Sequence, residues 1–265
     1  MPTIHEIETA LYRLAPQELA MPWDNVGLLI GDPQDEVHRV LVALDVTEDV
    51  AEEAIRQKAE LIVAHHPVMN CKWNPVQTIR EDFPQGHLFR RLIKAGVAAI
   101  CMHTNLDAAP GGVNDALAET LGVMDTKPLT AEGIGRFGVL KDGPMPLSGF
   151  VRIVSKKLHG NGLRYCDAGK EVFRIAVGGG ACGDYVEQAI AVGCDTFVTA
   201  DLRYHEFLDA VPKGINLIDA GHFPTEDLVC EVLIRYLQEE FPTLWLQKST
   251  SHREVIQYYV EEGEI

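Results

Sequence analysis

The chain has too few basic residues for a broad nucleic-acid-binding surface. Among its 265 residues, 23 Lys and Arg stand against 39 Asp and Glu, which gives a formal net charge of −16. Affinity for nucleic acid depends largely on the neutralisation of phosphates by basic side chains. We therefore expect no nucleic-acid partner, although a small local basic patch and a cation-binding site are both compatible with this charge.

The sequence also lacks the marks of export, membrane insertion and disulfide bonding. Its first residues, 1–6, contain neither a basic n-region nor an apolar h-region, and no run approaches the roughly 18 apolar residues of a membrane span. The cysteines form no C-x-x-C pair, which favours free thiols over a disulfide framework or a thiolate zinc site. We expect a cytoplasmic protein with no membrane partner. The cysteines are Cys71, Cys101, Cys166, Cys182, Cys194 and Cys230.

What is present is a regular alternation of strand and helix signals. Apolar runs at 40–45, 61–64 and 96–102 predict buried strands, and the acidic residues after Thr47 predict a capped helix between the first two. This alternation predicts an α/β fold with mainly parallel sheets.

Internal sequence repeats predict two related lobes. A shift of 135 positions aligns Val40 with Ile175 and Val63 with Val198, and a shift of 119 aligns His103-x3-Asp107 with His222-x3-Glu226. After a helix at 113–121, residues 123–128 form the expected boundary, so we predict lobes 1–124 and 125–265 that face each other across a shared cleft. The C-terminal segment could pack back on the first lobe.

The strand signal Leu61–Ala64 ends abruptly in His65-His66-Pro67. Adjacent residues of a regular strand point to opposite faces, but Pro67 stops regular pairing at the strand end. There the two rings could bind two neighbouring ions, or one ring could bind an ion while the other contacts a ligand of that ion. A buried histidine is often only a hydrogen-bonding core residue, but imidazole is also the commonest metal ligand, and two in succession at a strand end favour a metal site.

Two further polar clusters supply carboxylates. His103 and Asp107 follow the strand signal at 96–102, at the carboxyl end where ligands bind in open α/β sheets, although Asp107 could equally be a loop or capping residue. His222 and Glu226 precede a helix predicted at 227–237. If Thr225 caps that helix, Glu226 lies in its first turn, either as a metal ligand or merely as a complement to the helix dipole.

These clusters predict the metal ligands His65, His66, Asp107, His222 and Glu226, with His103 in reserve. Mixed imidazole and carboxylate ligands suit zinc, iron, manganese, cobalt or nickel more than calcium or magnesium. Two such ions with a bridging carboxylate could generate hydroxide at neutral pH, which points to hydrolysis.

Two more segments flank the predicted centre. The glycine-rich stretch 177–183 could cradle a phosphate, but a tight strand–helix turn is the simpler interpretation. The segment Asp201 to Glu206 ends the repeated strand, where His205 could act as an acid or base and Arg203 could contact a phosphate; structural roles explain both equally well. The segment 23–31 predicts a strand and turn and by itself carries no chemical signal.

Taken together, these motifs resemble the Ngg-interacting-factor-three-like family of dinuclear-metal-centre proteins, also known as GTP cyclohydrolase type-2-like proteins. The matching pieces lie in order along nearly the whole chain. They are Pro22 to Leu28, His65-His66-Pro67, His103 to Asp107, the glycines 178–180, Asp201 to His205, and Gly221 to Glu226.

The resemblance implies a two-lobed subunit of the family's short form, assembled into a toroidal homohexamer, with two divalent transition-metal ions per subunit. Carried over by motif, its ligands fall on the five residues named above. It also implies a hydrolase of a nucleotide-like or phosphorylated small molecule, with His103 or His205 moving protons. The alternative is a non-enzymatic metal-binding ring that serves as scaffold, chaperone or sensor.

Overall fold

The computed structural model describes residues 1–70, 72 and 75–259. The chain divides into two compact units: unit 1 is Met1–Ala116 with Asp227–His252, and unit 2 is Leu117–Glu226 with Arg253–Ile265. The sequence predicts lobes 1–124 and 125–265 with a C-terminal segment that could pack back on the first; in the structure the first division falls between Ala116 and Leu117, and the segment Asp227–His252 belongs to unit 1.

Unit 1 is built on a five-stranded sheet in the order β1-β4-β3-β2-β11. Only β1 runs antiparallel, beside β4, and the remaining pairs are parallel. The elements of this unit are α1 (Ile4–Leu14), η1 (Gln17–Leu19), β1 (Gly27–Ile30), β2 (Arg39–Ala43), α2 (Glu48–Gln57), β3 (Leu61–Ala64), α3 (Pro84–Ala95), β4 (Ala98–Cys101), α4 (Thr104–Ala108), α10 (Val229–Glu240) and β11 (Trp245–Lys248).

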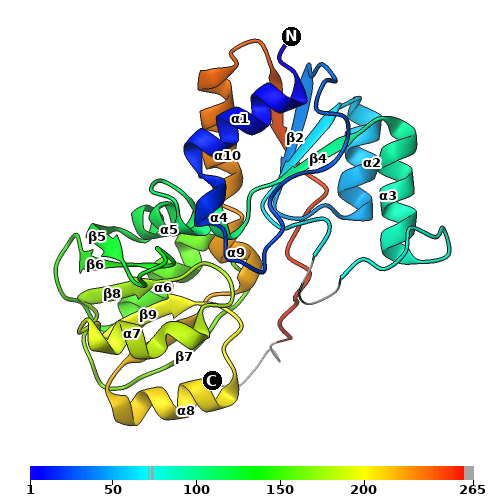
Figure 1. Cartoon of the computed structure of the whole chain (residues 1–265). Helices are drawn as coiled ribbons and strands as arrows, with labels where there is room; N and C mark the ends of the chain where they lie inside the picture. The colour runs from blue at the N-terminus through cyan, green and yellow to red at the C-terminus, as the bar shows by residue number, and fades with distance from the viewer. Residues whose placement is uncertain (71, 73–74, 260–265) are drawn as a thin grey trace. The chain divides into compact units, whose positions relative to one another are not determined.

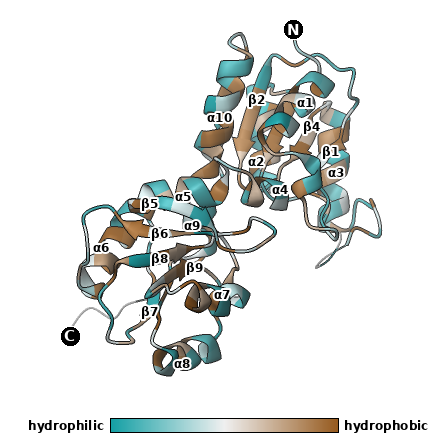
Figure 2. Cartoon of the chain, turned by 60° about the vertical axis from the view of Figure 1, so that its left-hand side comes forward, coloured by the Kyte–Doolittle hydropathy of each residue, from teal (hydrophilic) through white to brown (hydrophobic). Residues whose placement is uncertain are grey.

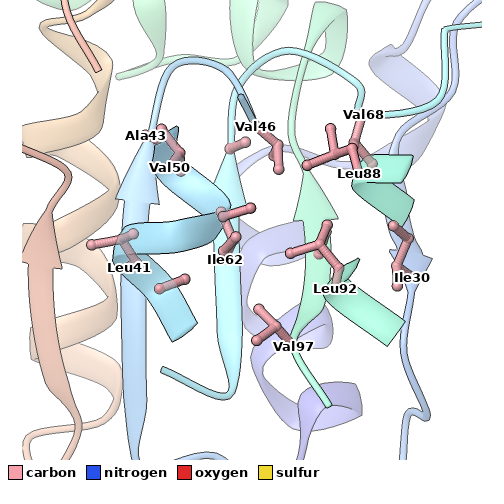
Figure 3. Packing of buried hydrophobic residues seen from close by; sticks show 14 of the residues in the cluster. Ile30, Leu41, Ala43, Val46, Val50, Ile62, Val68, Leu88, Leu92 and Val97 are labelled. Carbon is pink, nitrogen blue, oxygen red and sulfur yellow. The ribbon is translucent and has the colours of Figure 1, made fainter. Parts of the chain in front are cut away.

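Helices cover both faces of this sheet, with α2 and α3 on one side and α1 and α10 on the other (Figure 1). Side chains alternate along each strand, so Leu41 and Ile62 pack with Leu92 in the core beneath α2 and α3 (Figure 3). Val40 and Val42, which are equally buried, face the other layer. Burial of both faces explains why these strands read as continuous apolar runs.

Local signals placed several elements of unit 1 correctly. Thr47 is the N-cap of α2, and its hydroxyl accepts a hydrogen bond from the backbone N–H of Val50 at 3.2 Å. The strand expected at 61–64 and the helix expected at 113–121 are present as β3 and as α5 (Val113–Leu121). The division between the units falls within α5.

Unit 2 is built on a six-stranded mixed sheet in the order β5-β6-β8-β9-β10-β7. Only the pairs β8–β9 and β9–β10 are parallel. Its elements are β5 (Val123–Pro128), β6 (Arg136–Leu140), α6 (Leu147–Leu158), β7 (Arg164–Cys166), β8 (Arg174–Val177), η2 (Gly183–Tyr185), α7 (Val186–Ala191), β9 (Thr196–Thr199), α8 (Tyr204–Lys213), β10 (Asn216–Asp219) and α9 (His222–Glu226).

The expectation of mainly parallel sheets is therefore wrong for unit 2. Residues 129–135 join β5 directly to β6 as an antiparallel pair, a connection too short for the crossover that parallel strands require. Two further pairs are antiparallel: β6 pairs with β8, and β7 pairs with β10.

The two βαβ repeats predicted from the 135-residue shift are both present. β2 and β3 begin at Arg39 and Leu61, whereas β8 and β9 begin at Arg174 and Thr196. Each pair is parallel, and hydrophobic residues dominate both β2 and β8 (Figure 2). A helix connects the strands in each repeat, α2 in the first and α7 in the second.

All five cysteines that the structure describes have free thiols. The remaining one, Cys71, lies outside the described residues. In the described part of the chain, no helix combines the length and hydropathy needed to cross a lipid bilayer.

Candidate metal centre

Three histidines meet at one edge of the unit 1 sheet. His65 and His66 follow β3 and His103 follows β4, and because these strands are parallel neighbours their carboxyl ends share an edge. The ring centroids lie 5.0 Å apart for His65 and His66, 5.2 Å for His65 and His103, and 5.6 Å for His66 and His103. Their ligand atoms lie within 4.8 Å of one another, which makes them a group able to hold a metal ion.

This spacing fits a transition-metal ion. An imidazole nitrogen binds zinc at about 2.0–2.1 Å, so the ring centroid lies about 3.2 Å from the ion. Two rings on one tetrahedral ion then have centroids about 5 Å apart. His65 and His66 both lie beyond the last residue of β3, and their rings are tilted by only 44°. Strand alternation therefore does not force them to opposite faces.

The other ring nitrogen of each histidine is already engaged. Nδ1 of His65 lies 2.7 Å from the carbonyl oxygen of Met102, which can only accept a hydrogen bond, so Nδ1 carries the proton. Nδ1 of His66 and of His103 lies 2.7 Å and 2.9 Å from the carboxylates of Asp45 and Asp24. This arrangement leaves Nε2 of each ring with the lone pair that a metal needs, as in known histidine metal sites.

Asp24 and Asp45 are held as anions by these contacts. Burial would raise the pKa of Asp24, but hydrogen bonds from His103 and Thr104 lower it well below the usual range. Burial would likewise raise the pKa of Asp45, and its two histidine partners, His66 and His252, lower it in the same way. Each carboxylate therefore remains an acceptor that fixes its imidazole at neutral pH.

Asp107, one of the predicted ligands, lies beside His65. It belongs to the one-turn helix α4, and its Oδ1 lies 3.5 Å from Nε2 of His65. Its main-chain carbonyl accepts a hydrogen bond from the Asn114 side chain at 2.9 Å. Unit 1 thus combines three imidazoles with a neighbouring carboxylate.

Unit 2 carries the second predicted pair on α9. His222 and Glu226 lie four residues apart on this single turn, with Nε2 of His222 3.0 Å from Oε2 of Glu226. Nδ1 of His222 lies 2.6 Å from Asp201, which has a left-handed backbone (φ +54°). Burial alone would lower the pKa of His222, but the hydrogen bonds and charges of Asp201 and Glu226 raise it to about 11.

The expected capping role of Thr225 is wrong. Thr225 lies inside α9, where its hydroxyl donates back to main-chain carbonyls and accepts a hydrogen bond from Gly180 N at 3.0 Å. The next helix, α10, begins only at Val229. Glu226 is therefore the last residue of a one-turn helix. Asp107 likewise lies in a one-turn helix, the one that follows β4. The sequence match at a shift of 119 positions thus corresponds to two similar local structures.

The glycine-rich loop packs against this carboxylate. Gly180 has a φ of +63°, and a Cβ there would lie 2.2 Å from Oε1 of Glu226 and 3.1 Å from Nε2 of His222. The loop is the tight turn that the simpler interpretation predicted, and it needs a glycine because Glu226 occupies the space of a side chain.

Replacing Gly180 by alanine is therefore expected to weaken metal retention by roughly tenfold or more, because Glu226 must move. Gly169→Ala is the matched control: Gly169 also has a positive φ (+73°), but no heavy atom of the described residues lies within 4 Å of its added Cβ. Both variants would carry about 1 kcal/mol or more of backbone strain. Zinc titration of both proteins measures the difference, and equal retention would contradict the role given to Gly180.

Arg203 and His205 lie on the α8 side of unit 2. Arg203 is exposed and pairs with Glu206 at 2.5 Å and with Asp184 at 3.2 Å. His205 is exposed, with its ring centroid 5.4 Å from that of Tyr204. Neither belongs to a candidate ligand group among the residues that the structure describes.

The sequence did not identify the carboxylates that orient the rings. Asp24 lies in the segment 23–31, which by itself carries no chemical signal, and Asp45 is only the last residue of the apolar run at 40–45. Asp201 had one usable signal, its alignment with His66 in the repeat. His252 gave none, although its Nε2 lies 2.8 Å from Asp45.

An α/β fold with imidazole and carboxylate clusters beside strand ends defines a candidate metalloprotein. The chain belongs to the Duf34/NIF3 (NGG1p interacting factor 3) family, whose sequence profile matches residues 2–254. The resemblance seen in the sequence motifs is thereby confirmed.

Relatives and solved structures agree with this assignment. The chain is 35% identical over 230 residues to a "GTP cyclohydrolase 1 type 2 homolog" of Clostridium perfringens, covering 84% of this chain and 86% of that protein. A Streptomyces coelicolor protein of the same description is 34% identical over 251 residues, which cover 90% of this chain and 87% of that protein. A Bacillus cereus protein related to NIF3 has a similar crystal structure, with a TM-score of 0.89, 27% identity and coverage of 97% and 99%. The crystal structure of a hypothetical protein of Staphylococcus aureus is also similar, with a TM-score of 0.89 and 30% identity, and the match covers 98% of this chain and 100% of that one.

Proposed function

We propose that this protein holds two divalent transition-metal ions through His65, His66, Asp107, His222 and Glu226. The observation that carries the proposal is the placement of the histidine rings: in His65, His66 and His222, Nδ1 lies against a carbonyl or carboxylate, which leaves Nε2 as the nitrogen for an ion. In His222, whose pKa is raised, an ion would displace the proton that Nε2 shares with Glu226. Nitrogen-rich ligands favour zinc, iron, cobalt or nickel, and carboxylates keep manganese among the candidates.

We further propose that the centre catalyses hydrolysis of a nucleotide-like or phosphorylated small molecule. Bound transition-metal ions would supply hydroxide at neutral pH and polarise the bond under attack. The protein would hold its ligand rings in one orientation through Asp45 and Asp201, and His103 lies close enough to His65 and His66 to move a proton at the centre or to bind an ion itself. His205 and Arg203 are proposed as a second proton carrier and a phosphate contact. The description of the relatives as homologs of a GTP cyclohydrolase makes GTP the first substrate to test.

The first test is metal content followed by turnover. Protein purified without chelators is expected to contain about two transition-metal ions per chain by elemental analysis, and His66→Ala is expected to contain fewer. Metal-loaded wild type is then incubated with GTP and other nucleotides, with metal-stripped protein as the control. Metal-dependent product formation supports the hydrolase. Two bound ions without turnover of any nucleotide would favour the non-enzymatic scaffold, and a wild type that remains empty after loading would contradict both proposals.

Assembly into a homohexamer is also proposed, on the family resemblance alone. Native mass spectrometry of the full chain would report the subunit number directly, and a monomer would contradict it.

A further inference from the structure

The strand order of unit 1 lines up polar residues along one edge of its sheet. β11, β2, β3 and β4 are successive parallel neighbours, so the residues that follow them lie side by side. The segment 249–252 follows β11, Asp45 follows β2, and His66 follows β3. Residues far apart in the sequence therefore form one continuous row.

Asp45 joins the two ends of this row. Its Oδ1 lies 2.7 Å from Nδ1 of His66, and its Oδ2 lies 2.8 Å from Nε2 of His252. An ionised carboxylate can only accept hydrogen bonds, so each imidazole donates to one oxygen. With both oxygens engaged, the carboxylate plane is fixed, and with it the ring of His66 whose Nε2 is proposed to bind an ion.

His252 is itself held in place by the segment that precedes it. Ser249 N donates to the carbonyl of Val42 at 2.7 Å, and His252 N donates to Oγ of Ser249 at 3.3 Å. The buried carboxylate of Glu53 accepts hydrogen bonds from Ser249, Thr250 and Ser251. The side chain of His252 is only 10% exposed, so its contact with Asp45 is part of the packed structure.

We propose that His252 is a positioning residue of the metal centre. Through Asp45 it fixes the orientation and tautomer of His66, so the segment 249–252 sets the affinity of the ion that His66 binds. The inference deepens the proposed metal binding and depends on it. It requires no change in the ligand set and no contact between His252 and the ion.

The test measures metal affinity of the full chain, with cobalt(II) as the probe, by its visible spectrum in competition with a chelator. His252→Ala is expected to weaken the affinity of one ion by about tenfold, in the range observed for outer-shell partners of metal ligands. His252→Gln is expected to restore much of the loss, because its amide can still donate to Asp45. His38→Ala is the control, since His38 is exposed and pairs only loosely with Glu60, at 3.8 Å.

A double-mutant cycle separates positioning from a general structural role. If His252 acts through His66, then His252→Ala has no further effect on cobalt binding in a His66→Ala background. An equal loss in both backgrounds, or an affinity unchanged by His252→Ala, overturns the inference. Thermal unfolding of the metal-free variants identifies any loss caused by misfolding. A wild type that binds no ion would overturn the proposed function as well, whereas a metal-loaded wild type with an unaffected His252→Ala variant overturns only the positioning role.

Discussion

Replacing Glu226 by alanine is expected to weaken metal binding by at least roughly 100-fold, because Glu226 is proposed as a direct ligand and its loss should exceed the 10–100-fold effect of a residue that only orients a ligand. Glu226 lies one helical turn from His222, at 3.0 Å, and is almost fully buried. The substitution removes the carboxylate against which Gly180 packs but leaves the hydrogen bonds of Thr225 in place. We therefore expect unit 2 to remain folded while the protein loses the proposed ions.

Elemental analysis after dialysis, together with circular dichroism, would check this expectation. Glu187→Ala is the matched control, because Glu187 lies on another helix of the same unit, is exposed and pairs with Lys213 at 2.5 Å. Retention of two ions by Glu226→Ala would exclude this carboxylate from the centre. Loss of ions in the control as well would show that the assay reports general destabilisation.

Replacing Glu53 by alanine is expected to lower the free energy of unfolding of unit 1 by about 3 kcal/mol or more. Its buried carboxylate receives hydrogen bonds from the side chains of Ser249 and Thr250 and from the main chain of Thr250 and Ser251. Bonds to a charged group contribute about 1.5–3 kcal/mol each, and removal of one partner leaves several donors without their acceptor. Urea unfolding would measure the loss, with Glu52→Ala as the control, because Glu52 is an exposed neighbour on the same helix.

The same carboxylate makes the stability of unit 1 depend on pH. Burial would raise the pKa of Glu53, but the hydrogen bonds from Ser249, Thr250 and Ser251 lower it from 4.5 to about 2. A lowered folded-state pKa contributes stability above the unfolded value, here on the order of 3 kcal/mol. The contribution is lost as the pH falls from about 4.5 towards 2. The stability difference between wild type and Glu53→Gln should therefore shrink over that range, and a constant difference would contradict the prediction.

Several features of the site could be predicted because their signals are local. An apolar run that ends in His65-His66-Pro67 marks a strand end, and the spacing of His103 and Asp107, four residues apart, matches one helical turn. The same spacing recurs in His222 and Glu226. The predicted cap at Thr225 failed because its hydroxyl is committed to α9 and to Gly180, a contact across 45 residues that the local pattern does not contain.

By itself, the sequence determined several strands and helices, the two βαβ repeats and a set of ligand candidates, because periodicity, capping and turn preferences act between residues a few positions apart. Only the tertiary structure decided the mixed sheet of unit 2, the residue at which the chain returns to unit 1, Asp227, and the partners that orient the histidines. Asp24 lies 79 positions from His103, and His252 lies 207 from Asp45. Such pairs meet because strand order brings distant chain segments to one sheet edge, and no local pattern specifies that order.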